Sequence, residues 1–164
     1  MRKRIIGQAQ QQEAFPTDQV WLNLGEIAEV EITSEDDAYP IESALLPGKT
    51  PGWRAAQPGK QTIRLLFSHP QNLQRIWIKF EESSIERTQE YLLRYSSDAG
   101  QSFQEIVRQQ WNFNPQGSIS ETEDHQVELR AVILLELTVT PDISGGGAFA
   151  SLRDCPEFCV TVYH

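Results

Sequence analysis

The sequence contains few of the residues on which catalysis, metal binding and disulfide formation depend. Its 164 residues include two cysteines, three histidines and one methionine. Cys155 and Cys159 have neither a second thiol pair nor a nearby histidine, so they cannot complete a tetrahedral zinc site. We expect both to be free thiols, with a local disulfide or a redox role as the alternatives. The chain also has no G-x-S-x-G, H-E-x-x-H, phosphate-loop or dinucleotide-binding pattern. These absences favour binding over catalysis.

Basic residues and long hydrophobic runs are also scarce. Lys and Arg number 14 against 23 Asp and Glu, and the formal charge is −9. A surface of this sign disfavours nucleic acid and anionic membranes as partners. The longest apolar run, 131–135, is far too short for a membrane span, and the basic start of the chain is followed by only Ile5-Ile6 before Gly7. We therefore predict a cytoplasmic protein with no membrane or nucleic-acid partner.

The pattern that is present is one of alternating apolar residues. Residues 1–18 are polar and Gln-rich and are predicted to be a flexible arm, with one domain over 19–164. Two runs, at 61–67 and 75–80, have the two-residue period of half-buried strands. Segments 91–96 and 102–108 resemble a hairpin, 111–125 a long polar loop, and 141–147 a glycine-rich loop. The expected fold is all-β: an antiparallel β-sandwich, a jelly roll of about eight strands.

The order of several short motifs resembles the discoidin, or coagulation-factor C-type, domains of the galactose-binding-like superfamily. More narrowly, the chain is similar to small bacterial discoidin-like carbohydrate-binding proteins. The resemblance covers roughly residues 27–140. Its motifs are Thr33-Ser34-Glu35, Ala44-Leu45, Gly52-Trp53-Arg54, the strands 61–67 and 73–80, and the hairpin 91–103 with Ser97-Asp98-Ala99-Gly100.

This resemblance implies an eight-stranded jelly roll whose binding loops gather at one end. It also implies a structural calcium near the loop before the tryptophan, where the family usually has an Asp-Gly pair. Leu46 and Pro47 replace the usual carboxylate here. We therefore expect no cofactor, with a structural calcium as the alternative. The stretch 53–56 with Thr62-Ile63 also resembles the amino-terminal domain of the single-strand-break repair scaffold, a jelly roll that binds a polymerase.

Trp53 and Arg54 are the first candidate ligand-binding pair. An aromatic face stacks on sugar C–H groups, and a guanidinium donates to hydroxyl groups. The alternative interpretation is that Trp53 packs inside the domain while Arg54 pairs with a carboxylate.

The second candidate is the segment around Gln110, Trp111 and Asn112, which interleaves amides with aromatic rings. It is predicted to leave a strand and enter a loop, where binding residues concentrate. Arg87 is expected at the same end. The alternative is that the amides cap strand ends and Arg87 is a solvated arginine. The acidic clusters 35–37 and 121–124 carry oxygen ligands suited to calcium, but a solvated acidic surface is the favoured interpretation.

These observations predict a non-catalytic binding module for a carbohydrate or another polyhydroxylated ligand, bound by loops at one end. The alternative is a protein–protein interaction or assembly domain that uses the same loops. A hydrolase ranks third, because it would require a facing carboxylate pair that the sequence does not reveal. The oligomeric state is not predicted.

Overall fold

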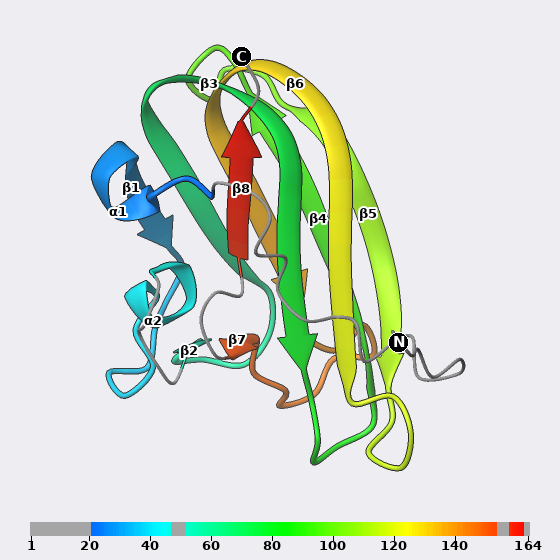
Figure 1. Cartoon of the computed structure of the whole chain (residues 1–164). Coiled ribbons are helices and arrows are strands. Elements are labelled where there is room, and N and C mark those ends of the chain that lie inside the picture. Colours follow the sequence, from blue (N-terminus) through cyan, green and yellow to red (C-terminus); the bar gives the residue numbers. More distant parts are fainter. Residues whose placement is uncertain (1–20, 47–51, 154–157, 163–164) are drawn as a thin grey trace, which may run out of the picture.

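The computed structural model describes residues 21–46, 52–153 and 158–162, and antiparallel strands dominate it (Figure 1). The predicted sandwich of jelly-roll type is confirmed; the predicted arm, 1–18, lies outside the described residues. No helix in the described ranges has the length and hydrophobicity needed to span a bilayer. The elements are α1 (Leu24–Ile27), β1 (Ala28–Ile32), α2 (Glu42–Leu45), β2 (Gly52–Arg54), β3 (Gln61–Glu81), β4 (Arg87–Ser96), β5 (Gln104–Phe113), β6 (Ser120–Thr140), β7 (Ser151–Arg153) and β8 (Phe158–Val162).

Two strands of 21 residues, β3 and β6, belong to both layers of the sandwich. Figure 1 shows both strands arching over the top of the molecule. The first half of β3 and the second half of β6 form one layer with β1, β4 and β5, in the order β1-β3-β6-β4-β5. The other halves form the second layer with β8. The two predicted strands of 61–80 are therefore one continuous strand.

The arch requires local irregularity in both strands. Pairing between β3 and β6 shifts register between Leu66 and Arg75, and the exposed Pro70 lies within this stretch. On β6, Ala131 has φ +53°, and its amide donates to Asn72 Oδ1 at 3.0 Å. The bulge changes which residues face inward, from odd positions before it to even positions after it. Hence both predicted runs of β3 bury their apolar residues.

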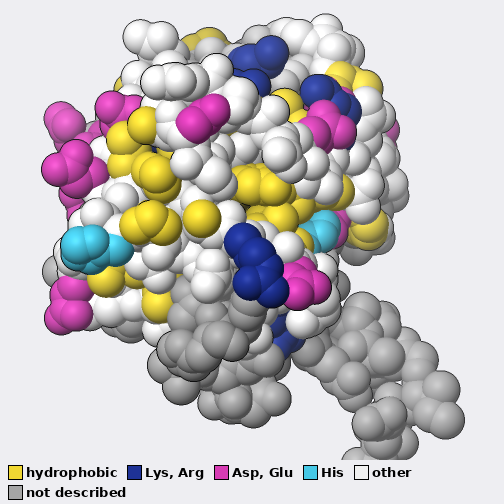
Figure 2. Space-filling view, turned by 90° about the horizontal axis from the view of Figure 1, so that it is seen from above, with side chains coloured by type: hydrophobic (Ala, Val, Ile, Leu, Met, Phe, Trp, Pro, Cys, Tyr) yellow, Lys and Arg dark blue, Asp and Glu magenta, His cyan; other side chains and the backbone are white. Residues whose placement is uncertain are grey.

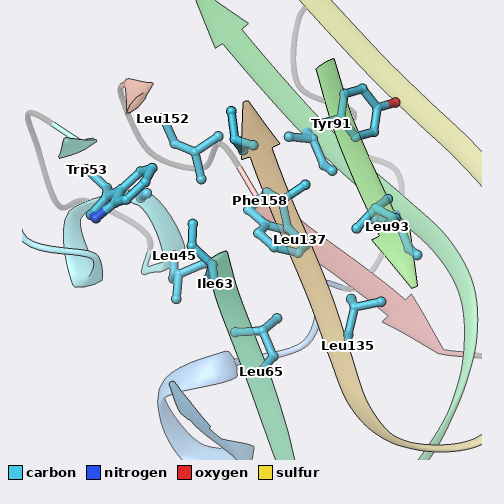
Figure 3. Close-up of a cluster of buried hydrophobic side chains, with 14 of the residues drawn as sticks. Leu45, Trp53, Ile63, Leu65, Tyr91, Leu93, Leu135, Leu137, Leu152 and Phe158 are labelled. Carbon is cyan, nitrogen blue, oxygen red and sulfur yellow. The ribbon is translucent and has the colours of Figure 1, made fainter. Parts of the chain in front are cut away.

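The core fills the space between the layers and extends to the small β2–β7 sheet at one end (Figure 3). Figure 3 shows Trp53 and Leu152 at that end, and Leu65 and Leu135 farther along the first layer. Burial of such side chains contributes roughly 1.5–3 kcal/mol each. Among the largest fully buried side chains are Trp53, Tyr91, Phe80, Phe113, Phe158, Ile63, Leu65, Leu73, Ile76, Ile78, Leu93 and Leu135.

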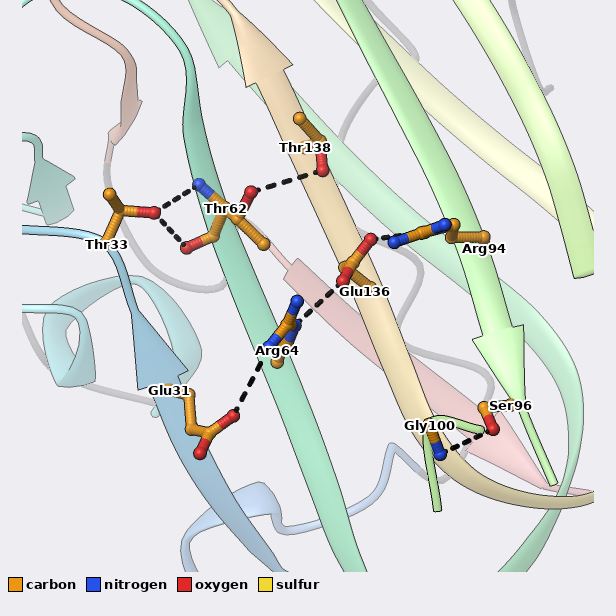
Figure 4. A network of polar contacts seen from close by, with 9 residues as sticks. All are labelled: Glu31, Thr33, Thr62, Arg64, Arg94, Ser96, Gly100, Glu136 and Thr138. Atoms are coloured by element: carbon orange, nitrogen blue, oxygen red, sulfur yellow. Dashed lines mark hydrogen bonds and ion pairs between the residues drawn. The ribbon is translucent and has the colours of Figure 1, made fainter. Parts of the chain in front are cut away.

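A charged ladder crosses the outer face of the first layer (Figure 4). Glu136 is only 2% exposed, and its two carboxylate oxygens accept hydrogen bonds from Arg64 Nε (2.7 Å) and Arg94 Nε. Burial of the Glu136 carboxylate raises its pKa, but the two guanidinium groups together lower it more, so the pKa lies below its ordinary value. The ladder joins three adjacent strands through one carboxylate.

The hairpin turn between β4 and β5 confirms the prediction from Ser97-Asp98-Ala99-Gly100. Gly100 has φ +88°, and its amide donates to Ser96 Oγ at 2.9 Å (Figure 4). Hydrogen bonds from Ser102 and Ser96 lower the pKa of Asp98 to about 2. The short polar side chains thus close the turn on themselves.

The prediction of one long polar loop over residues 111–125 is wrong. Strand β5 extends to Phe113 and β6 begins at Ser120, so only the residues between them form a loop. The segments 33–46, 52–60, 82–86, 114–119 and 141–150 all leave the strands at the end of the sandwich that holds β2 and β7. This end is called the loop end below.

Candidate functional site

A cleft of about 310 Å³ opens at the loop end. It combines hydroxyl groups, carboxylates, one guanidinium and two aromatic rings, which is a set suited to a polar ligand. The opposite end, seen from above in Figure 2, shows several groups of hydrophobic side chains with charged side chains between and around them. The cleft is lined by Tyr39, Arg54, Glu81, Glu82, Ser83, Ser84, Ile85, Gly147, Ala148, Phe149 and Ser151.

The backbone fixes Arg54 on one wall of this cleft. Arg54 pairs with Ser151 in the β2–β7 sheet, its amide donates to the Tyr39 carbonyl at 3.2 Å, and its carbonyl accepts from the Asp36 amide at 2.8 Å. Its guanidinium lies 4.6 Å from the centroid of the Phe149 ring. Arg54 is exposed at the cleft and, within the described residues, stacks on an aromatic ring instead of pairing with a carboxylate. Ligand binding by Arg54 stays a prediction.

Glu82 also lines the cleft, and it pairs with the buried Arg87. Glu82 Oε1 accepts from Arg87 Nε at 2.8 Å, and Oε2 accepts from the amide (3.1 Å) and the hydroxyl (3.0 Å) of Ser84. Burial raises the pKa of Glu82, but the Arg87 and Ser84 donors lower it more, so its net pKa is below the ordinary value. Glu82 is consequently an anion that accepts hydrogen bonds and does not serve as a proton donor.

Arg87 supports the cleft from inside the domain. It is 4% exposed, donates from Nη1 to the Pro141 carbonyl (2.5 Å) and to Gln89 Oε1 (3.0 Å), and lies 4.8 Å from the Phe113 ring centroid. The predicted location at the loop end is correct. Direct ligand binding by Arg87 is not compatible with this burial, and neither is the alternative of a solvated arginine.

Trp53 cannot stack on a ligand in this structure. Its side chain is fully buried, and Nε1 donates to the Ser34 carbonyl at 3.0 Å. The alternative interpretation, in which Trp53 packs inside the domain, is therefore correct. In a strand, adjacent residues point to opposite faces, so Trp53 enters the core while Arg54 emerges beside it.

Gln110, Trp111 and Asn112 lie on β5 and do not line the cleft. Trp111 is 37% exposed, and Asn112 Oδ1 accepts from Thr88 Oγ1 at 2.8 Å. The loop predicted for this segment is replaced by a strand that, in the described part, pairs with β4 alone. An edge strand can be polar along its length and then shows little alternation of apolar residues. Its sequence pattern therefore resembles that of a loop.

The acidic segment 121–124 was predicted to be a solvated surface, and part of it is instead buried. Glu121 is 3% exposed and Glu123 is half-buried, because both face the interior from β6. Burial, followed by the proximity of Glu123, raises the pKa of Glu121 to about 9. His125, expected in a loop, lies on the same strand face and contacts Tyr91.

The calcium site that the family resemblance implies falls on the loop before Trp53. Leu46 stands there where the family usually has a carboxylate, and residues 47–51 lie outside the described part. Within that part, no group of three or more His, Cys, Asp or Glu side chains is arranged to hold a metal ion. The acidic segment 35–37 is engaged locally: Glu35 Oε2 accepts from the Ile41 amide at 2.8 Å, and Asp36 Oδ1 from the Ala38 amide at 2.9 Å.

Sequence reasoning missed the residues that complete the cleft around Arg54, above all Tyr39 and Phe149. Segment 148–150 reaches the site because the Ala55 amide donates to the Ala150 carbonyl (2.9 Å) and the Gly59 amide to the Ala148 carbonyl (3.1 Å). The one available signal was an aromatic residue, Phe149, two positions after the glycine-rich segment 145–147. Such a position places a large ring on a loop.

The chain belongs to the F5/8 type C domain family, whose model matches residues 29–152. Its fold is similar to the third family 32 carbohydrate-binding module of a family 31 glycoside hydrolase from Clostridium perfringens, with 16% identity, a TM-score of 0.64, and coverage of 87% of this chain and 95% of that one. A second similar structure is the family 32 module of AlyQ in complex with 4,5-unsaturated mannuronic acid, with 14% identity, a TM-score of 0.61, and coverage of 87% and 98%. A third is the family 32 module of Clostridium perfringens NanJ in complex with galactose, with 19% identity, a TM-score of 0.56, and coverage of 85% and 96%. No curated protein matches the chain by sequence.

Proposed function

We propose that this chain is a non-catalytic carbohydrate-binding module whose ligand occupies the cleft at the loop end. The observation that carries the proposal is the composition of the cleft: the stacked pair Arg54 and Phe149 lies among hydroxyl groups. The hydroxyls of Tyr39, Ser83 and Ser151 have no hydrogen-bond partner within the described part of the chain. Free hydroxyls and a fixed guanidinium provide donors and acceptors for a polyhydroxylated ligand.

The two carboxylates of the cleft support binding and argue against hydrolysis. Glu81 pairs with Lys79 at 3.3 Å, and Glu82 pairs with Arg87 at 2.8 Å. Glycoside hydrolysis requires a carboxylic acid whose pKa is raised so that it can protonate the leaving group. The pKa of Glu82 is instead lowered, so Glu82 acts as a hydrogen-bond acceptor for sugar hydroxyls.

A glycan array followed by isothermal titration calorimetry tests the proposal. We expect saturable binding of a saccharide that weakens about tenfold or more in Phe149→Ala and Arg54→Ala, since each removes a wall of the cleft. Trp111→Ala, an exposed aromatic outside the cleft, is the matched control and should bind normally. A folded protein that no saccharide saturates contradicts the proposal.

A second candidate, a protein-interaction domain, is favoured by three exposed isoleucines at the loop end. Ile85, Ile119 and Ile143 are 47%, 45% and 48% exposed. Backbone bonds hold two of them, from the Glu82 amide to the Ile119 carbonyl (2.8 Å) and from the Ile143 amide to the Thr88 carbonyl (2.9 Å). Exposed apolar residues that gather at one site are typical of interfaces. Affinity capture from native lysate with wild type and an Ile119→Ser/Ile143→Ser variant tests this candidate; a partner retained equally by both contradicts it.

A further inference from the structure

Three charged side chains line the cleft, namely Arg54, Glu81 and Glu82, and they differ in whether they have a partner of opposite charge. Glu81 and Glu82 each have their own cation, Lys79 and Arg87. Arg54 has no ion-pair partner in the part of the chain that the structure describes; its guanidinium contacts only the Phe149 ring there. The cleft therefore presents one uncompensated guanidinium, although the whole chain carries a charge of −9.

This guanidinium is also pre-organised. The backbone of Arg54 is fixed by bonds with Asp36, Tyr39 and the paired strand β7, and its side chain is stacked on Phe149. A cation that is already held in place loses little conformational entropy when a ligand binds. The planar guanidinium donates two parallel N–H groups, a geometry that matches a carboxylate.

The other free groups of the cleft suit the remainder of a sugar ring. The hydroxyls of Tyr39, Ser83 and Ser151 line the same cleft as Arg54, and Ile85, 47% exposed, adds an apolar surface. Neutral sugars would use the hydroxyls but leave the charge of Arg54 without a counterpart. A sugar that carries a carboxylate would use both.

We propose that the cleft selects acidic sugars of the uronate class, whose carboxylate pairs with Arg54 while the ring hydroxyls bond to Tyr39, Ser83 and Ser151. This inference rests on the proposed carbohydrate-binding function and specifies its ligand. The chain's overall negative charge repels a polyanion at long range, so short uronate oligomers should bind more tightly than long polymers at low salt.

The decisive comparison uses one saccharide with and without its charge. Trigalacturonate, its methyl-esterified form and galactotriose are titrated calorimetrically into the full chain, with a mannuronate trimer and sialyllactose as further carboxylate-bearing probes. We expect unesterified trigalacturonate to bind about tenfold or more tightly than its methyl ester, because a hydrogen bond between a guanidinium and a carboxylate is stronger than one to a neutral ester. Arg54→Gln should abolish this preference, and Arg54→Lys should retain part of it.

Arg130→Gln is the matched control, because it removes the same charge from a side chain that is 74% exposed and does not line the cleft. It should leave the acid-over-ester preference unchanged. Equal affinity for acid and ester, or a preference that survives Arg54→Gln, overturns the inference. Binding of galactotriose alone also overturns it and leaves the carbohydrate-binding function standing, whereas a folded protein that binds no saccharide overturns both. If sialyllactose is the only acidic saccharide that binds, the cleft selects a carboxylate but not the uronate class, and the inference is overturned.

Discussion

The hydroxyl oxygen of Tyr91 lies 2.8 Å from His125 Nε2, although the two residues belong to opposite layers of the sandwich. Tyr91 projects from β4 into the core, and its ring also lies 5.5 Å from that of Phe80 on the facing layer. Burial, and then the nearby carboxylates of Glu123 and Glu121, raise the pKa of the Tyr91 phenol above its ordinary value. The phenol therefore remains neutral and joins the layers by a hydrogen bond.

Removing this hydroxyl tests its contribution to stability. Tyr91→Phe keeps the ring but leaves His125 without its bond across the layers, and should lower the free energy of unfolding by about 1–2 kcal/mol. Urea denaturation measures the change. Tyr95→Phe removes a hydroxyl that bonds to Gln104 at a solvent-exposed site, and should cost less than about 0.5 kcal/mol. Equal losses in the two variants would show that the Tyr91–His125 bond adds no more to the free energy of unfolding than an exposed hydrogen bond does.

Glu121 should make stability depend on pH. Its pKa of about 9 in the folded protein exceeds the ordinary value of 4.5, so its favourable contribution is complete below pH 4.5 and is lost as pH rises towards 9. Glu121→Gln resembles the neutral form and removes this dependence. We expect wild type to lose stability relative to the variant by up to about 1.4 kcal/mol per pH unit across this window.

Paired urea titrations at pH 5, 7 and 8.5 measure this difference. The ionisable groups that act on Glu121 are Glu123 on the same strand and Tyr91 on the opposite layer, and His125 contacts both of these; Glu121→Gln preserves all three. A wild-type curve parallel to that of the variant at all three pH values contradicts the prediction.

Glu136 should show the opposite pH dependence. Its folded pKa is lowered, so its stabilising contribution is present above pH 4.5 and is lost as pH falls through the lower folded value. Glu136→Gln should cost about 2–3 kcal/mol at pH 7, because two guanidinium groups lose their shared partner, and less near pH 3. Glu31→Gln, at a side chain 60% exposed and 3.9 Å from Arg64, is the control and should cost at most about 0.5 kcal/mol. An equal cost for both variants is the contrary result.

Arg87 should affect ligand binding without touching the ligand. Arg87→Met removes the cation beside Glu82 and leaves that carboxylate partly buried and unpaired, at a cost of roughly 3–5 kcal/mol. Arg87→Lys retains the charge but loses the fork to Pro141 and Gln89, and should be less destabilised. Saccharide affinity should fall in both variants because Glu82 is no longer held in place. The loss of the Arg87 donor also raises the pKa of Glu82, and a titration of binding against pH detects that change. Normal affinity in a folded Arg87→Met protein would separate Arg87 from the site.

Trp111→Ala distinguishes the cleft from the second candidate of the sequence analysis, the segment around Gln110, Trp111 and Asn112. The side chain is on the edge strand β5 and outside the cleft lining, so saccharide affinity should change less than twofold. Calorimetry with the ligand identified on the array measures the effect. A tenfold loss would move the site from the loop end to the edge of the sandwich.

The apolar pattern predicted the fold because alternation is a local property of the chain. Ile63, Leu65 and Phe67 point inward on β3 as their spacing requires, and the turn at Asp98 closes with residues that are adjacent in sequence. Polar residues were predicted less well. The sequence predicted a loop at Trp111 because an edge strand can be polar along its whole length. It predicted a surface position for Glu121 because the residue that covers it, Tyr91 on β4, is 30 positions earlier in the sequence.

The sequence by itself determined the two-layer antiparallel fold and the family, and left open whether Trp53 packs inside the domain or faces a ligand. Only the tertiary structure decided which side chains share the cleft, since Arg54, Glu82 and Phe149 come from three separate segments. It also decided the surroundings of Arg54, whose guanidinium stacks on Phe149 from a segment 95 residues later in the sequence. The physical reason is that alternation is fixed by adjacent peptide units, whereas the proximity of side chains from separate segments depends on how those segments pack.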